Sequence, residues 1–211
     1  MKAKKQINPK LMLILSTLLV GLIGLGILGG YTYASFTDKD SQENNFAASG
    51  LKGSITEEFT PPGTVEIGKS YSKKVTIKNE EKAPLFVRVL VQPEMTMSDG
   101  QVLLASNIGK EIQLDIGSDW LLGEDGFYYY KKVLNANETT QPLFAKVTLA
   151  NNLDANYQNM KLTISIKSET VSAAGVNFRD AYFHGTIPSQ SNLKIIDSLY
   201  DSISIKTKGG N

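Results

Sequence analysis

The chain has 211 residues, of which 41% are hydrophobic and 20% are charged, and it contains no cysteine. This composition is typical of one globular domain with a short additional segment, and it excludes a disulfide framework and a cysteine nucleophile. The formal net charge of +1 lacks the basic excess that nucleic-acid binding requires, so we expect no nucleic-acid partner.

Residues 1–34 are expected to be a signal peptide that is removed. Four lysines precede the uncharged apolar residues 11–30, and Thr32 and Ala34 follow at the small-residue spacing that signal peptidases read. An uncleaved anchor is the alternative, because the apolar run is long enough to cross a bilayer. We expect cleavage between Ala34 and Ser35, membrane contact only through the uncut leader, and a secreted product. Without the four leader lysines, 22 basic residues become 18 against 21 acidic ones, a net charge of −3.

Residues 51–211 are expected to form one β-sandwich domain. In residues 70–79, one set of alternate positions is largely apolar and the other is polar, which predicts a half-buried strand. The largely apolar set is Tyr71, Lys73, Val75 and Ile77. Other runs are rich in β-branched and aromatic residues, at 85–91, 127–133, 143–149 and 160–171. Turn-forming residues separate the runs, at 61–63, 98–100, 124–126 and 151–152. Short strands without a long helical pattern indicate an all-β antiparallel β-sandwich.

Residues 175–211 form a less regular C-terminal part of this domain. They mix aromatic residues with Pro188 and end in a short alternating run, Ile203, Ile205 and Thr207. We expect a long loop or a short helix, followed by a closing strand.

The chain offers few groups for catalysis. His184 is the single histidine, whereas a zinc protease of the usual kind needs two histidines one helical turn apart. There is no G-x-S-x-G nucleophile motif either. We therefore predict a protein that is not an enzyme, with no catalytic residue, metal ligand or cofactor. Acidic residues gather at 37–40 and 123–126, where polar turns are favoured over calcium sites.

Lysines in the predicted strands raise the question of a Lys–Asn isopeptide crosslink, which would suit an exported protein without cysteine. The candidates are Lys73, Lys78, Lys131 and Lys146. Strand alternation places most of them on a solvated face, so exposed lysines are the favoured interpretation.

The aromatic run at 127–130 and Trp120 suggest either core packing or an interface. With a period of two, Tyr128 and Tyr130 share one face of the strand, and Phe127 and Tyr129 share the other. Core packing is favoured, with both sides of the strand covered. If one side is left open, Trp120, Tyr128 and Tyr130 are the candidate interface residues.

The sequence also resembles a known superfamily. The stretch SFTDKDSQENNFAASGLKGSI after the predicted cleavage site resembles the start of TasA and camelysin, which are exported proteins cut by the dedicated signal peptidase SipW. The segments KKVTIKNEEKAPLFVRVLV, DWLLGEDGFYYYKKVL and ISIKSETVSA resemble the BsaA-type matrix proteins of that superfamily more closely. The resemblance extends from the leader to about Ala174.

The resemblance implies a jelly-roll-like sandwich, with an immunoglobulin-like arrangement as the alternative. It also implies a subunit of the biofilm matrix fibres of Gram-positive bacteria, whose partners are further copies, a SipW-type peptidase and other matrix proteins. Residues 35–50 would then be an N-terminal assembly arm that adds as a strand to the next subunit. Its candidate residues are Ser35, Phe36, Asp38 and Phe46. A disordered N-terminus is the alternative for this polar stretch.

Two other functions remain open at this point. A monomeric surface adhesin or a minor fibre component is the second hypothesis. A camelysin-like metalloprotease is the third, and the chain lacks a recognisable metal-binding motif for it.

Overall fold

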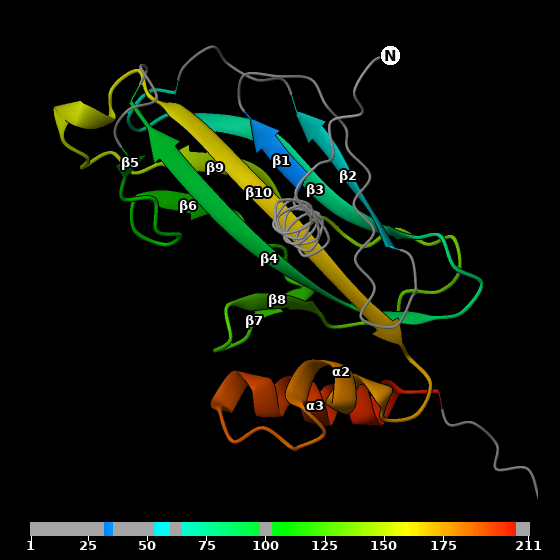
Figure 1. Cartoon of the computed structure of the whole chain (residues 1–211). Coiled ribbons are helices and arrows are strands. Elements are labelled where there is room, and N and C mark those ends of the chain that lie inside the picture. Colours follow the sequence, from blue (N-terminus) through cyan, green and yellow to red (C-terminus); the bar gives the residue numbers. More distant parts are fainter. Residues whose placement is uncertain (1–31, 36–52, 60–64, 98–102, 206–211) are drawn as a thin grey trace, which may run out of the picture. The chain divides into compact units, whose positions relative to one another are not determined.

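A computed structural model describes residues 32–35, 53–59, 65–97 and 103–205. Ten strands in these residues form two antiparallel sheets that face each other (Figure 1). The first sheet has the order β1 (Thr32–Ser35), β10 (Lys161–Ser172), β4 (Leu85–Thr96), β8 (Phe127–Tyr130) and β7 (Trp120–Leu122), and β5 (Leu103–Leu104) also pairs with β4. The second has the order β2 (Gly53–Phe59), β3 (Ser70–Asn79), β9 (Phe144–Leu149) and β6 (Ile112–Leu114). The predicted all-β antiparallel sandwich is confirmed.

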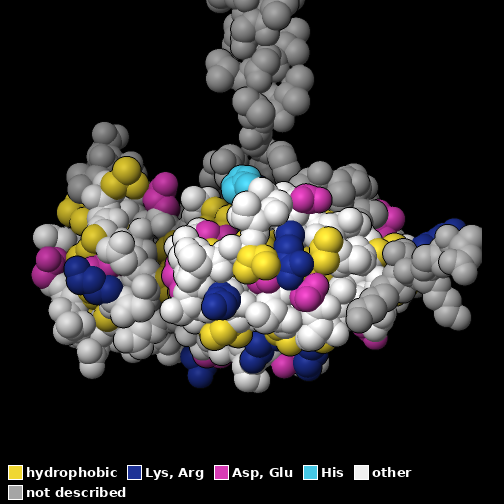
Figure 2. Space-filling model, turned by 90° about the horizontal axis from the view of Figure 1, so that it is seen from below, with side chains coloured by type: hydrophobic (Ala, Val, Ile, Leu, Met, Phe, Trp, Pro, Cys, Tyr) yellow, Lys and Arg dark blue, Asp and Glu magenta, His cyan; other side chains and the backbone are white. Residues whose placement is uncertain are grey.

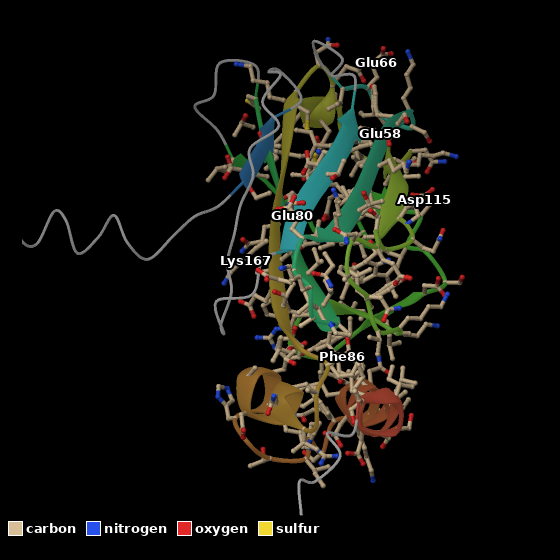
Figure 3. All side chains as sticks on the ribbon, turned by 90° about the vertical axis from the view of Figure 1, so that its right-hand side faces the viewer. Glu58, Glu66, Glu80, Phe86, Asp115 and Lys167 are labelled. Carbon is tan, nitrogen blue, oxygen red and sulfur yellow. The ribbon has the colours of Figure 1, made fainter. Side chains whose placement is uncertain are left out.

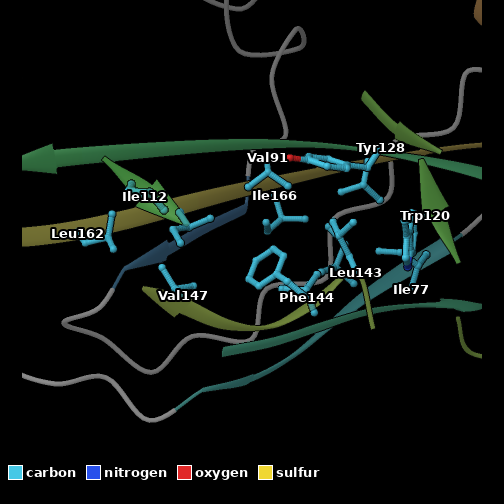
Figure 4. Packing of buried hydrophobic residues seen from close by; sticks show 14 of the residues in the cluster. Ile77, Val91, Ile112, Trp120, Tyr128, Leu143, Phe144, Val147, Leu162 and Ile166 are labelled. Carbon is cyan, nitrogen blue, oxygen red and sulfur yellow. The ribbon is translucent and has the colours of Figure 1, made fainter. Parts of the chain in front are cut away.

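Alternating residues of the long strands build the core between the two sheets. Leu162, Ile164 and Ile166 of β10 are at most 1% exposed, while their neighbours along the strand are at least partly exposed. In Figure 4, Leu162 and Ile166 face Val147 and Phe144 of β9 across this core. Burying an aliphatic side chain of this size stabilises the fold by roughly 1.5–3 kcal/mol. The hydrophobic period of two therefore decides which face of each sheet points inward.

The lengths of several strands differ from the sequence-based expectation. Strand β4 continues to Thr96, beyond the predicted end at residue 91, whereas β8 ends at Tyr130 rather than at residue 133. Strands β5, β6 and β7 have only two or three residues each, and segments this short show no period.

The C-terminal part consists of two helices, α2 (Asn177–Phe183) and α3 (Ser191–Ile203). The expected short helix is confirmed, with two helices in place of one, and the alternative of a long loop is wrong. The expected closing strand is wrong as well, since Ile203 ends α3 and Ile205 makes an isolated bridge with Ala174. A short 3-10 helix, η1 (Ala155–Tyr157), precedes β10.

The helices bury a second cluster of aromatic side chains against the first sheet. Phe86 of β4 stacks on Tyr200 of α3 with ring centroids 3.9 Å apart, and Phe178 of α2 meets the edges of both rings. Figure 3 shows Phe86 at the end of the sheet next to the helices. Tyr129 of β8 joins this cluster, while Tyr128 belongs to the core between the sheets. Strand β8 is therefore covered on both faces.

Charged side chains of both signs are interspersed on the end of the molecule that carries the helices. Figure 2 views this end and shows Lys and Arg side chains next to Asp and Glu side chains. Such a mixed surface has no large field of one sign to steer a charged partner.

Candidate assembly edges

The predicted cleavage site lies in β1. This strand pairs antiparallel with β10, so that Thr32 lies opposite Ile166, Ala34 opposite Ile164 and Ser35 opposite Thr163. The bond between Ala34 and Ser35 is therefore part of a paired strand.

The rest of the predicted leader and arm lies outside the described residues. This applies to Phe36, Asp38 and Phe46, whose assembly role stays a prediction.

Strand β10 is the inner neighbour of β1. It has twelve residues, and β4 pairs with all of them on one side. On the other side β1 pairs with four, Thr163–Ile166, and β1 is the outermost strand of the sheet. The order of the strands in the sheet implies that β10 becomes the edge strand when β1 is removed. An edge strand presents backbone N–H and C=O groups that can accept an added strand.

The opposite end of β10 is held close to the second sheet. A Cβ atom added to Gly53, the first residue of β2, would lie 2.8 Å from Cγ2 of Thr170. Only glycine allows this approach without a shift of the neighbouring side chain. The two sheets are thus fixed together near Thr170, whereas β1 pairs toward the Lys161 end of the strand.

The other edge of the sandwich carries an apolar groove of about 560 Å³ between β6 and β7. Leu114 of β6, Ile116 and Leu122 of β7 contribute to its lining, and Leu122 is 44% exposed. The predicted interface residues Trp120 and Tyr128 also line the groove, although they are only 4% and 5% exposed.

Trp120 and Tyr130 pack on each other inside the sandwich, with ring centroids 5.0 Å apart. The indole Nε1–H of Trp120 donates to the carbonyl oxygen of Gln141 at 3.0 Å. Tyr130 is 5% exposed. The structure therefore brings the three predicted interface aromatics into the core, and Trp120 and Tyr128 also line an open groove.

Arg88 of β4 connects the sheet to the helices, a role that the sequence did not indicate. Its Nη2 lies 2.6 Å from Glu169 of β10, and its Nη1 lies 3.1 Å from the hydroxyl of Tyr129 and 3.3 Å from the carbonyl oxygen of Tyr182 in α2. Its guanidinium carbon is 4.1 Å from the ring centre of Phe127. Since carboxylate, hydroxyl, carbonyl and ring surround the cation, Arg88 serves as a structural anchor between elements.

The same cluster changes the ionisation of two side chains. Burial raises the pKa of the Tyr129 hydroxyl far above its usual value, and the hydrogen bond to Asp125 adds to the rise. Glu169 is partly buried, which alone would raise its pKa, but the hydrogen bonds and charges of Lys167 and Arg88 together hold the pKa of this carboxylate below its usual value. The shift of Tyr129 therefore follows mainly from burial, and the shift of Glu169 follows from its two cationic neighbours.

Lys73 corrects one expectation about the strand lysines. Its side chain is fully buried, and its Nζ lies 2.7 Å from Oε2 of Glu57 on the adjacent strand β2. Burial lowers the pKa of Lys73, and the charge of Glu57 opposes this effect. The expectation that most of the strand lysines face solvent is met by Lys78 and Lys146, which are exposed. Lys131 is partly exposed. Lys73 follows the inward alternation of Val75 and Ile77.

The acidic stretch at 123–126 has structural roles. Both carboxylate oxygens of Glu124 accept hydrogen bonds from backbone N–H groups at the start of α3. The donors are Asn192 at 2.8 Å and Leu193 at 3.0 Å. These bonds lower the pKa of Glu124. Asp125 accepts the hydroxyl of Tyr129 at 2.6 Å. Glu124 lies in the turn between β7 and β8, and an acidic residue in a turn that caps a distant helix leaves no local sequence signal.

The described part of the chain contains no cluster of three or more His, Cys, Asp or Glu side chains that could hold a metal ion. His184 ends α2 in a left-handed backbone conformation, with φ of 54°. The acidic residues 37–40 lie outside the described ranges.

No helix within residues 32–35, 53–59, 65–97 and 103–205 has the length and apolar character needed to span a membrane.

Comparisons with known proteins leave the family of the chain open. No protein-family model matches the chain, and neither the curated proteins nor the solved structures include a similar protein.

Proposed function

We propose that the chain is an exported structural protein, a subunit of extracellular biofilm matrix fibres. A SipW-type peptidase would remove the leader after Ala34, and the mature N-terminus would add as a strand to a further copy of the protein. The protein would act outside the cell, with other matrix proteins as additional partners.

One observation carries the proposal. Strand β10 has β1 as its outer neighbour, and β1 contains the predicted cleavage site. Cleavage at Ala34 would therefore leave β10 at the edge of a sheet whose other strands are already in place. Strand addition is a common mode of assembly for such an edge, because main-chain hydrogen bonds give affinity and alternate side chains give specificity.

The composition of the predicted arm supports the same mode. Residues 35–50 contain two phenylalanines, Phe36 and Phe46, among polar residues. Large aromatic side chains are the usual anchors of an interface.

Electron microscopy of purified protein that begins at Ser35 tests the proposal. We expect filaments from this form, and we expect the double variant Phe36→Asp/Phe46→Asp to remain monomeric because it lacks both anchors. The variant Asn44→Asp/Asn45→Asp adds the same two charges to the arm and serves as the matched control, which should still form filaments. Equal assembly by the two double variants would contradict a role for the phenylalanines.

A monomeric surface adhesin or minor fibre component is the second candidate. The apolar groove beside Trp120 and Leu122 favours it, since an open groove on a monomer can hold an apolar partner. A protein that stays monomeric and binds to preformed fibres would support this candidate.

The camelysin-like metalloprotease is the third candidate, and it rests on the sequence resemblance alone. Casein cleavage by the purified protein that a chelator abolishes would support it.

A further inference from the structure

We propose that β1 is a self-blocking strand, which keeps the edge of β10 occupied until the leader is cut. This inference rests on the proposed function and adds a form of regulation to it. Its basis is the register, because the four residues that pair with β10 are Thr32–Ser35. The predicted cut after Ala34 falls between the third and the fourth of these residues.

Cleavage would divide the strand unequally. Thr32, Tyr33 and Ala34 would leave with the leader, and only Ser35 would stay with the sandwich. The three departing residues lie opposite Ile164, Ser165 and Ile166 of β10. A single remaining residue cannot sustain a ladder, since each strand pairing depends on several successive backbone bonds.

The uncut chain has an advantage over any incoming strand. Because β1 belongs to the same chain as β10, its effective concentration at the edge is on the order of millimolar. An arm from another copy must displace β1 before it can pair. After cleavage this competitor is gone, so one proteolytic step both frees the arm at Ser35 and opens the edge of β10.

The block differs from simple tethering at the membrane. A tethered chain becomes competent once it is released from the bilayer, whereas a self-blocked chain stays inactive in solution as long as β1 is intact. The two can therefore be separated with a protein that lacks the apolar run but keeps β1. The form that begins at Tyr31, the first residue of the compact unit, meets this need.

Hydrogen exchange at low protein concentration is the first measurement. We expect alternate backbone amides of residues 163–166 to exchange at least roughly tenfold more slowly in the Tyr31 form than in the Ser35 form, because β1 protects the amides that point toward it. Sedimentation at higher concentration should show the Tyr31 form as a monomer and the Ser35 form as an assembly.

A proline variant of the Tyr31 form supplies the control. Adjacent residues of a strand point their N–H groups to opposite sides, so the double variant Tyr33→Pro/Ala34→Pro removes at least one donor on the side of β10. We expect this variant to show fast exchange in β10 and to assemble like the Ser35 form, although it has the same length as the blocked chain.

The outcomes separate the inference from the proposed function. Equal exchange in the Tyr31 and Ser35 forms, or equal assembly by both, would overturn the self-block and leave the fibre role standing. Slow exchange in the Tyr31 form with no assembly by the Ser35 form would instead overturn the fibre role.

Discussion

Tyr200 carries a hydroxyl group that is fully buried between α3 and the first sheet. The oxygen lies 2.8 Å from the carbonyl of Tyr130 and 3.2 Å from that of Val87, and the ring stacks on Phe86. Burial raises the pKa of Tyr200 well above the usual value of 10.0. The hydroxyl thus joins a helix to two strands only while it remains protonated.

Replacing Tyr200 by Phe should lower the free energy of unfolding by about 1–2 kcal/mol at pH 8, because two buried carbonyl groups lose a donor. The folded state holds the phenol proton more tightly than the unfolded state does. This contribution is complete below pH 10 and is lost as the pH rises above 10. Urea unfolding at pH 8 and pH 10.5 should therefore show a smaller alkaline loss for Tyr200→Phe than for the parent. If the parent and Tyr200→Phe lost equal stability between pH 8 and pH 10.5, the raised pKa of Tyr200 in the folded state would be contradicted.

Two neighbouring ion pairs between β2 and β3 differ in burial and should differ in energy. Lys73 and Glu57 are 0% and 16% exposed at their side chains, whereas Lys74 and Glu58 are 40% and 68% exposed. Glu58 is labelled in Figure 3. A buried charge that loses its counter-ion is costly, while an exposed pair contributes little.

Glu57→Gln should therefore lower the free energy of unfolding by roughly 3 kcal/mol. Glu58→Gln is the matched control and should change it by less than about 1 kcal/mol. Chemical denaturation at pH 7 measures both values. Similar effects for the two substitutions would show that Lys73 keeps its charge balanced without Glu57.

Helix α3 places adjacent isoleucines in opposite environments. Ile196 is fully buried in the aromatic cluster, and Ile195 is 56% exposed. Ile196→Ala should cost roughly 2–4 kcal/mol through lost burial and a cavity, and Ile195→Ala should cost less than about 1 kcal/mol. Thermal unfolding of the two variants tests whether the helices belong to the same cooperative unit as the sandwich. A similar small effect of both would mean that α3 contributes little to the stability of the sheets.

The same helix shows where the sequence was informative but was misinterpreted. Leu193, Ile196 and Tyr200 are buried and recur at intervals of three and four residues, which is a helical period. The sequence-based expectation was a long loop or a short helix before a closing strand, so it did not use this period, which extends through a helix of 13 residues. The long strands were predictable because a period of two recurs along much of their length, as in β3 and β10.

Across the whole molecule, the sequence predicted the sandwich but not its edges. Local patterns identify strands, whereas their order depends on pairings between distant segments, such as β1 with β10. The residues around Ala34 indicated a cleavage site through their size and position alone. Their pairing with Thr163–Ile166 emerges only from the structure. In the same way, the partners of Arg88 lie on β8, β10 and α2, so no local sequence motif indicated its structural role.

Assembly through the N-terminal arm can be measured by sedimentation velocity of the form that begins at Ser35, beside a form that begins at Ala47. We expect concentration-dependent polymers from the Ser35 form and a monomer from the Ala47 form, because only the Ser35 form carries residues 35–46 of the arm. Monomers from both forms across concentration and pH, or equal polymers from both, would contradict it.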